Sequence, residues 1–502
     1  MQPLSSLWAA GKRKELVWAA ALALLFGGLL CWWAPLKEAF EFGGDEGDEL
    51  IKGLMCGRGF RLYTEVWNDQ PPLHTLLLGL LFKACGPTLL GARVLTVCFA
   101  AVLVGTQFLM ASRKTTPATG ILASAFLVVS PYFLLLSVSV MLEMPAIASA
   151  WVASCIAMSW PKYGGRRFLF LSGLAMGLAL QIKLTAAIVI PALVVEIALS
   201  SIDTCGRWAF ASAARAVLLW VAGVCLTFFA VFFLCGEHFA FLWSAHFLPV
   251  THPEFGIPTN YRLDWQAFQP HLEAVLGVGA GVLAAVLAGQ LRAVCFPLVL
   301  LVTATGLHLF HCPYWNYYYL HLLVPMAWLS GYGVSGLWGL AARELKRQSP
   351  VGRLSAFAAG SAALLLMFLL LILGGRRLAE DLSYIAQRPR VQDDALVNAA
   401  LQNAPRTRWM FSERQIYSFH ARCSEPPELA VLHSKRMWSG GITGEELIAC
   451  LKHYRPEQMV LPSDVDGDAL WKPLLEADYR PECRYGGKIL FVRKDLAAGG
   501  SK

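Results

Sequence analysis

The chain has 502 residues, of which 56% are hydrophobic and only 15% are charged, and this balance excludes an ordinary soluble globular protein. Its net charge of +8 does not indicate nucleic-acid binding, because the basic residues form short clusters between apolar runs rather than one basic face. Most of the chain is therefore expected to lie in lipid.

Apolar runs recur from Leu16 almost to Gly374, and a spanning helix needs about 20 mostly apolar residues. Hydropathy predicts spans at about residues 16–35, 89–111, 117–136, 145–160, 168–182, 184–200, 211–235, 270–289, 293–310, 317–338 and 354–374. A single helix over 168–200 would be about 50 Å long, so we divide this stretch into two helices that meet at Lys183. The predicted fold class is a polytopic α-helical membrane protein with about 11 transmembrane helices.

Basic loops set the predicted topology, because short loops rich in Lys and Arg stay on the cytoplasmic side. The clusters are Lys12 to Lys14, Arg113 and Lys114, Lys162 to Arg167, and Arg343 to Arg353. The N-terminus is then cytoplasmic, residues 37–88 form the first external loop, and the odd number of spans exports the C-terminal segment. Within the external loop, the apolar piece from Pro71 to Cys85 is too short to span and is predicted to lie at the membrane interface.

The composition divides the chain into a membrane domain, residues 1–374, and a water-exposed domain, residues 375–502. In the second part, the strand-like runs RWMF, ELAVL, EQMVL and KILFV alternate with the helical stretch GEELIACLKHY, which predicts a small extracytoplasmic α/β domain. No glycine-rich phosphate-binding loop accompanies these runs. We therefore expect this domain to shape the substrate site or to bind a partner.

The first external loop contains the residues best suited to catalysis. Asp45 and Glu46 follow the first span, and a carboxylate near a membrane surface can act as a general base; an ordinary solvated loop is the alternative. Arg58, Arg61 and Lys183 lie on the same predicted face and could bind an anion. Further cations there are Lys52 and Arg93. A lone lysine between two apolar helices, such as Lys183, must either reach water or meet an anion.

The order of these features resembles a known family. An acidic pair after the first span, an amphipathic stretch, a glycine followed by an aromatic residue, and Pro71 and Pro72 opening an interfacial helix are similar to the GT-C membrane glycosyltransferases. The resemblance is greatest to the branch of protein mannosyltransferases, lipid A aminoarabinose transferases and Rgt-type lipopolysaccharide glycosyltransferases. It covers about the first 200 residues well and the later spans only in layout, and it implies that Asp45 is the catalytic carboxylate, with Glu46 beside it.

The resemblance also implies roles for later residues. A second catalytic acidic position falls on Glu143, where the family more often has aspartate; a water-exposed glutamate at the span boundary is the alternative. His311 and Tyr318, in the run HCPYWNYYY, are implied contacts of the lipid phosphate and sugar, although Tyr and Trp are also common at membrane interfaces without a catalytic purpose.

The predicted function is that of an inverting glycosyltransferase acting at the outer face of the cell membrane, expected to be the bacterial inner membrane. It would move a monosaccharide from a polyprenyl-phosphate donor to a lipid, glycan or protein acceptor, with membrane lipids around it and no nucleic acid bound. We expect no cofactor and no metal site, since the 13 cysteines lack zinc-ligand spacing, although a divalent cation stays open. A transporter or flippase of a lipid-linked substrate and a non-catalytic membrane scaffold are the alternatives.

Overall fold

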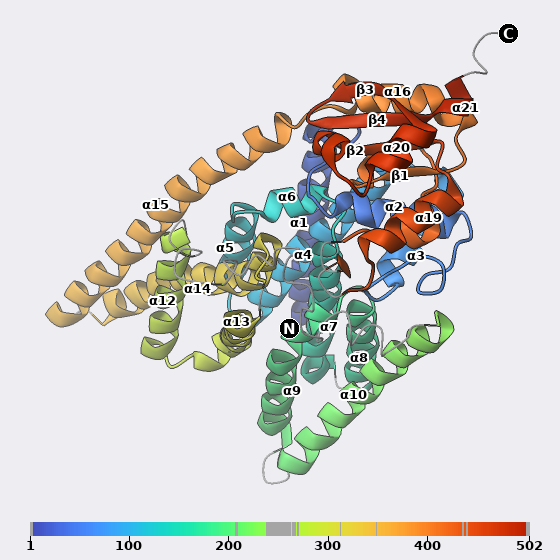
Figure 1. Cartoon of the computed structure of the whole chain (residues 1–502). Coiled ribbons are helices and arrows are strands. Elements are labelled where there is room, and N and C mark those ends of the chain that lie inside the picture. The colour runs from blue at the N-terminus through green and yellow to red at the C-terminus, as the bar shows by residue number, and fades with distance from the viewer. Residues whose placement is uncertain are drawn as a thin grey trace.

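The computed structural model describes residues 4–163, 165–205, 209–236, 263, 268, 271–311, 313–347, 349–433, 436–437 and 440–497. Apolar helices dominate it up to residue 386, and a small mixed sheet with short helices follows (Figure 1). The helices up to that point are α1 (Leu4–Trp33), α2 (Glu46–Gly57), α3 (Leu73–Cys85), α4 (Leu89–Lys114), α5 (Pro117–Val128), α6 (Phe133–Val138), α7 (Glu143–Tyr163), α8 (Arg167–Leu180), η1 (Leu184–Val189), α9 (Ile190–Cys205), α10 (Ala209–Leu234), α12 (Leu272–Leu287), α13 (Leu291–Phe310), η6 (Asn316–Tyr319), α14 (Leu320–Lys346) and α15 (Pro350–Ala386).

The predicted class of a polytopic helical membrane protein is confirmed. In the described part of the chain, six helices are long and apolar enough to cross a bilayer: those at Lys14–Trp33, Leu89–Lys114, Leu184–Ile202, Phe210–Leu234, Leu291–Phe310 and Pro350–Ala386. Four shorter apolar helices, α3, α5, α8 and α12, accompany them. The count of eleven spans is therefore not confirmed, although each predicted span has a helical counterpart at its position.

The helical structure is interrupted between α8 and η1 by the polar residues Gln181 and Lys183, where the sequence predicted two helices meeting at Lys183. Lys183 has an extended backbone, with φ −155° and ψ 133°, between Leu180 at the end of α8 and Leu184 at the start of η1. The carbonyl of Gln181 accepts a hydrogen bond from the Leu73 backbone N–H at 3.0 Å. The break therefore lies against the start of α3 in the first long loop.

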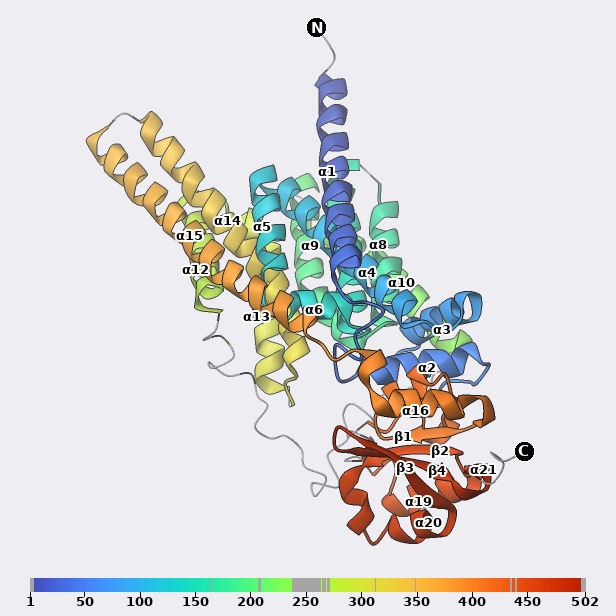
Figure 2. The same cartoon turned by 90° about the horizontal axis from the view of Figure 1, so that it is seen from above.

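The short helices α2 and α3 lie across one end of the helical bundle, between it and the C-terminal sheet (Figure 2). α2 packs on α3 through small residues: a side chain at Gly53 would meet Leu78 and Phe82. The apolar helix α3 fits the predicted interfacial position, because its 13 residues are too few to cross a bilayer. This end of the bundle holds the N-terminus of α7, the Lys183 break and the C-terminus of α13.

The C-terminal sheet has four strands in the order β1-β2-β4-β3. β1 (Met410–Ser412) is parallel to β2 (Gln458–Pro462), and β4 (Lys488–Arg493) is antiparallel to both β2 and β3 (Tyr479–Tyr485). The accompanying helices include α16 (Ala395–Asn403), α17 (Ile416–His420), α19 (Gly444–Tyr454), α20 (Lys472–Asp478) and α21 (Lys494–Ala497). The predicted α/β segment is confirmed, but ELAVL forms no strand: its first two residues end the 3₁₀ helix Pro427–Leu429, and β3 was not predicted.

The C-terminal segment packs directly on the first loop. α15 continues beyond residue 374 to Ala386 and leads the chain to an isolated bridge between Ala39 and Arg390. α17 then packs on α2, where the backbone of Ile416 lies against Gly47 so closely that a Cβ there would not fit. His420 shares a hydrogen bond of 2.9 Å with the Phe40 carbonyl. The two predicted domains therefore share an apolar core around α2.

Candidate active site

Asp45 lies at the N-cap position of α2, at the bundle end that faces the C-terminal segment. Its backbone carbonyl accepts from the Glu49 N–H at 3.3 Å, but its carboxylate does not cap the helix. The side chain is half-buried. Because this carboxylate does not cap the helix and is only partly shielded from water, it is available for chemistry.

Glu46 has a different environment from its neighbour. Its side chain is 0% exposed, and Arg93 binds it in bidentate fashion, with Nε to Oε1 at 2.9 Å and Nη2 to Oε2 at 2.8 Å. The backbone N–H groups of Phe42 and Val140 donate to the same two oxygens at 2.8 and 3.0 Å. Four hydrogen bonds occupy this carboxylate and tie the first loop to α4, while the predicted catalytic role of Glu46 stays a prediction.

Glu143 and Lys183 form a buried ion pair. Glu143, 1% exposed, is the first residue of α7, and the Lys183 ammonium, 7% exposed, donates a hydrogen bond to its Oε1. The alternative of a water-exposed glutamate at this position is therefore wrong. Because Glu143 takes one of the three N–H donors of the ammonium, it can hold Lys183 in place while the others face an anion.

Aromatic rings cover the other side of Lys183. Its Nζ lies 5.0 Å from the ring centroid of Tyr317 and 5.4 Å from that of Tyr318, both in η6, which precedes α14. Tyr318 in turn stacks on His308 with centroids 5.3 Å apart and lies 5.8 Å from His311. The faces of these rings favour the ammonium and shield it from water.

The predicted site residues therefore converge in part. Glu46, the neighbour of Asp45, accepts a hydrogen bond from the backbone N–H of Val140 at 3.0 Å, shortly before Glu143, and Glu143 binds Lys183. These contacts join the first loop, the start of α7 and the break after α8, which are far apart in the sequence. The scaffold alternative predicted that Asp45, Glu143 and Lys183 would not converge; the contact of Glu143 with Lys183, beside the loop that carries Asp45, argues against it.

Arg58 and Arg61 have partners outside this group, and their predicted phosphate-binding role stays a prediction. Arg58 lies at the far end of α2, where its guanidinium donates to the carbonyl of Arg422 at 2.6 Å. Arg61 is exposed and pairs with Glu65 at 3.4 Å. Of the further candidates, Lys52 is buried and bonds Glu49 at 2.7 Å, and Arg93 binds Glu46 as described above.

Asp45 also belongs to a second group of potential ligands. Ligand atoms of Asp45, Asp48 and His433 all lie within 4.8 Å of one another, and His433 comes from the C-terminal segment. Burial, with the Asp45 carboxylate beside it, raises the pKa of Asp48 to about 7, against the opposing effect of His433. Two carboxylates and an imidazole suit a divalent transition metal such as zinc. These are the residues that would hold a cation, whereas Glu143 is paired with Lys183.

Sequence reasoning missed several members of this region. Tyr317 was seen only as part of an aromatic run, and His433 has no neighbouring motif to mark it. Arg93 gave a usable signal, because a lone arginine within an apolar span must be paired and so indicates a buried acid nearby.

One segment of the sequence matches a known family model, and nearly the whole chain matches solved structures. Residues 69–234 match the family model described as dolichyl-phosphate-mannose-protein mannosyltransferase. The crystal structure of ArnT from Cupriavidus metallidurans in the apo state superposes with a TM-score of 0.63 and 14% identity, over 93% of this chain and 97% of that one. The same protein bound to undecaprenyl phosphate gives 0.60 and 16%, over 96% and 98%.

A more distant structural match extends the comparison. The archaeal oligosaccharyltransferase AglB from Archaeoglobus fulgidus, in complex with an inhibitory peptide and a dolichol-phosphate, gives a TM-score of 0.55 and 12% identity, over 98% of this chain and 75% of that one. A search of curated protein sequences finds no match. At these identities, the structural likenesses establish a shared fold.

Proposed function

Because the chain has the GT-C fold of membrane glycosyltransferases, we propose that it transfers a monosaccharide from a polyprenyl-phosphate donor to a lipid, glycan or protein acceptor. We place the N-terminus in the cytoplasm and the Asp45 cluster at the outer face, since the basic loops favour that orientation. The observation that carries the proposal is the Lys183–Glu143 ion pair beside the loop that carries Asp45, which the hydrogen bond from Val140 to Glu46 holds there.

In the proposed reaction, Asp45 is the general base. It accepts the proton of the acceptor nucleophile as that atom forms a bond to the anomeric carbon of the sugar. The bond between this carbon and the phosphate oxygen breaks, and its electron pair leaves with the polyprenyl phosphate. The anomeric configuration is inverted, and no acid is needed because the phosphate is a good leaving group.

Lys183 binds the departing phosphate in this proposal. Negative charge grows on the phosphate as the bond breaks, and a fixed cation nearby stabilises the transition state more than the ground state. Glu143 and the rings of Tyr317 and Tyr318 hold the ammonium in position from two sides. We therefore assign Glu143 a positioning role rather than the catalytic one that the resemblance implied.

A divalent cation is the alternative route. Asp45, Asp48 and His433 would hold it, and it would supply Lewis acidity at the phosphate. Asp45 would then be a ligand instead of a base. Because the Lys183 ammonium already provides positive charge on the bundle side, we propose transfer without a metal.

Replacement of Asp45 by Asn tests the proposal. Cells that lack the gene are complemented with the wild-type or variant chain, and glycosylated envelope products are measured by mass spectrometry. We expect Asp45→Asn to abolish the product while the purified variant still binds undecaprenyl phosphate with wild-type affinity. Glu65→Gln, a half-exposed acid of the same loop that pairs with Arg61, is the matched control and should leave the product unchanged. Normal product formation by Asp45→Asn would remove Asp45 from the mechanism.

The flippase alternative makes a different prediction in the same experiment. A flippase needs a charged residue to bind its substrate, but it needs no proton acceptor next to the sugar. Asp45→Asn would then leave both donor binding and product formation intact, whereas loss of Lys183 would reduce both.

A further inference from the structure

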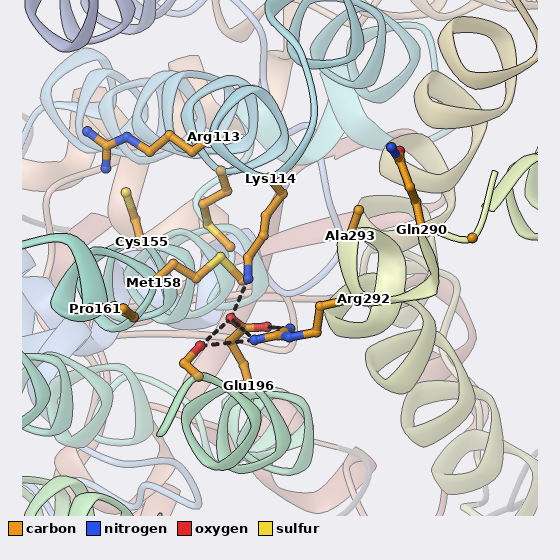
Figure 3. A pocket seen from close by; sticks show the side chains of 12 residues that line it. Arg113, Lys114, Cys155, Met158, Pro161, Glu196, Gln290, Arg292 and Ala293 are labelled. Carbon is orange, nitrogen blue, oxygen red and sulfur yellow. Dashed lines mark hydrogen bonds and ion pairs between the residues drawn. The ribbon is translucent and has the colours of Figure 1, made fainter. Parts of the chain in front are cut away.

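A pair of buried histidines joins the last turn of α13 to the start of α14. His308 and His321 are 1% and 2% exposed, and a hydrogen bond of 3.0 Å links Nε2 of His308 with Nδ1 of His321. The planes of the two rings differ by only 6°. At the other end of α13, Arg292 donates to both carboxylate oxygens of Glu196 at 2.6 and 3.0 Å (Figure 3). Side-chain bonds therefore hold α13 at both ends, and the histidine pair sets where its last turn meets α14.

The ring of Tyr318 lies over both histidines. Its centroid is 5.3 Å from that of His308 and 5.7 Å from that of His321, and its plane is inclined to theirs by 16° and 18°. The Lys183 ammonium lies 5.4 Å from the centroid of the same Tyr318 ring. A ring stacked on two neighbours loses both contacts when it tilts. The histidine pair therefore sets the orientation of the ring that faces Lys183.

Packing alone does not explain two histidines at this place. A neutral imidazole has one N–H and one bare nitrogen, so the bond between the rings leaves one of the two remaining nitrogens as a donor and the other as an acceptor. Among the described residues, neither of these nitrogens, Nδ1 of His308 and Nε2 of His321, has a hydrogen-bond partner. A buried polar atom without a partner destabilises the fold. Apolar rings would stack on Tyr318 without this cost, but they would lack the hydrogen bond that fixes both rings in one orientation.

We propose that His308 and His321 are positioning residues of the donor site, which hold the Tyr318 ring against the Lys183 ammonium. The inference rests on the proposed function, in which Lys183 binds the donor phosphate. The chain of contacts runs from the histidine hydrogen bond through the stacked ring to the ammonium. An ammonium held in one place binds a phosphate more tightly than a mobile one, because less side-chain freedom is lost on binding.

The test measures the affinity of the full-length protein for undecaprenyl phosphate by calorimetry in detergent, together with thermal stability. We expect His321→Leu to weaken binding about three- to ten-fold, which corresponds to the loss of one neutral hydrogen bond. The double variant His308→Leu and His321→Leu leaves no polar atom of the pair unpaired, so it should be more stable than the single variant and bind as weakly. In a Tyr318→Leu background, His321→Leu should cause no further loss of affinity, because the pair acts through that ring.

Ser172→Ala is the matched control, because it removes a buried hydrogen bond of 3.1 Å from the Trp220 indole N–H that joins α8 to α10. It should lower stability and leave affinity unchanged. Wild-type affinity in the well-folded double variant would overturn the inference, and so would a further loss from His321→Leu in the Tyr318→Leu background. Lys183→Gln separates this inference from the proposed function. Normal binding by Lys183→Gln would refute both, whereas weak binding there with normal binding by the double variant would refute the histidine inference alone.

Discussion

Replacement of Lys183 by Gln separates the two roles that the structure gives to this residue. The change removes a charge-assisted hydrogen bond to the donor phosphate, worth about 1.5–3 kcal/mol, which weakens binding of undecaprenyl phosphate by about 10- to 150-fold. It also leaves Glu143, 1% exposed, as a buried charge without its cation. Breaking a buried ion pair in this way costs about 3–5 kcal/mol of folding stability, so the single variant alone cannot distinguish lost binding from lost fold.

The double variant Glu143→Gln and Lys183→Gln resolves this ambiguity. Two neutral amides can hydrogen-bond to each other in place of the ion pair, so we expect thermal stability to return most of the way to that of the wild type. Undecaprenyl phosphate binding, measured by calorimetry in detergent, should stay as weak as in Lys183→Gln, because the ammonium is still absent. Wild-type affinity in a well-folded double variant would refute the assignment of Lys183 as the phosphate contact.

Further predictions address other parts of the chain. Asp45→Asn should reduce turnover by about 10²- to 10⁴-fold without changing undecaprenyl phosphate affinity; a parallel loss of affinity would contradict a purely basic role. Glu46→Gln should lower the unfolding temperature, because it weakens the buried contact with Arg93, and turnover per folded molecule should persist; selective loss of turnover would support the predicted catalytic role of Glu46. Burial lowers the pKa of His420 from 6.5 to about 4, so the folded state resists its protonation; stability should fall as pH decreases from about 6.5 to about 4, and His420→Gln should flatten this dependence in thermal melts. Chelation by EDTA and the change His433→Ala should both spare turnover; loss of activity in both, with rescue of the chelated enzyme by added zinc or manganese, would favour the metal route.

The sequence predicted the helical architecture well because hydrophobicity along the chain is a local property. The break at Lys183 followed from the length of the apolar stretch and the polar residues within it, and the structure places an extended residue there. The C-terminal strands were harder to predict. ELAVL follows two prolines, which lack the N–H that a sheet requires, and only its first two residues belong to an element, the 3₁₀ helix Pro427–Leu429. β3 contains Pro481 and several charged residues, because it is an edge strand exposed to water.

The separate roles of Asp45 and Glu46 could not be predicted from their neighbourhood, because the two side chains differ in their distant partners. Glu46 is fixed by Arg93 on α4 and by the backbone of Val140, whereas Asp45 lies beside Asp48 and His433. Helix geometry explains the division: adjacent residues at the start of a helix point about 100° apart, so one carboxylate enters the core of the loop while the other stays at its surface. The buried acid holds the loop in the position that the other acid needs. To find the general base in such a loop, one should therefore first identify the acid that is paired with a buried arginine. The acid next to it in the sequence is then the candidate base.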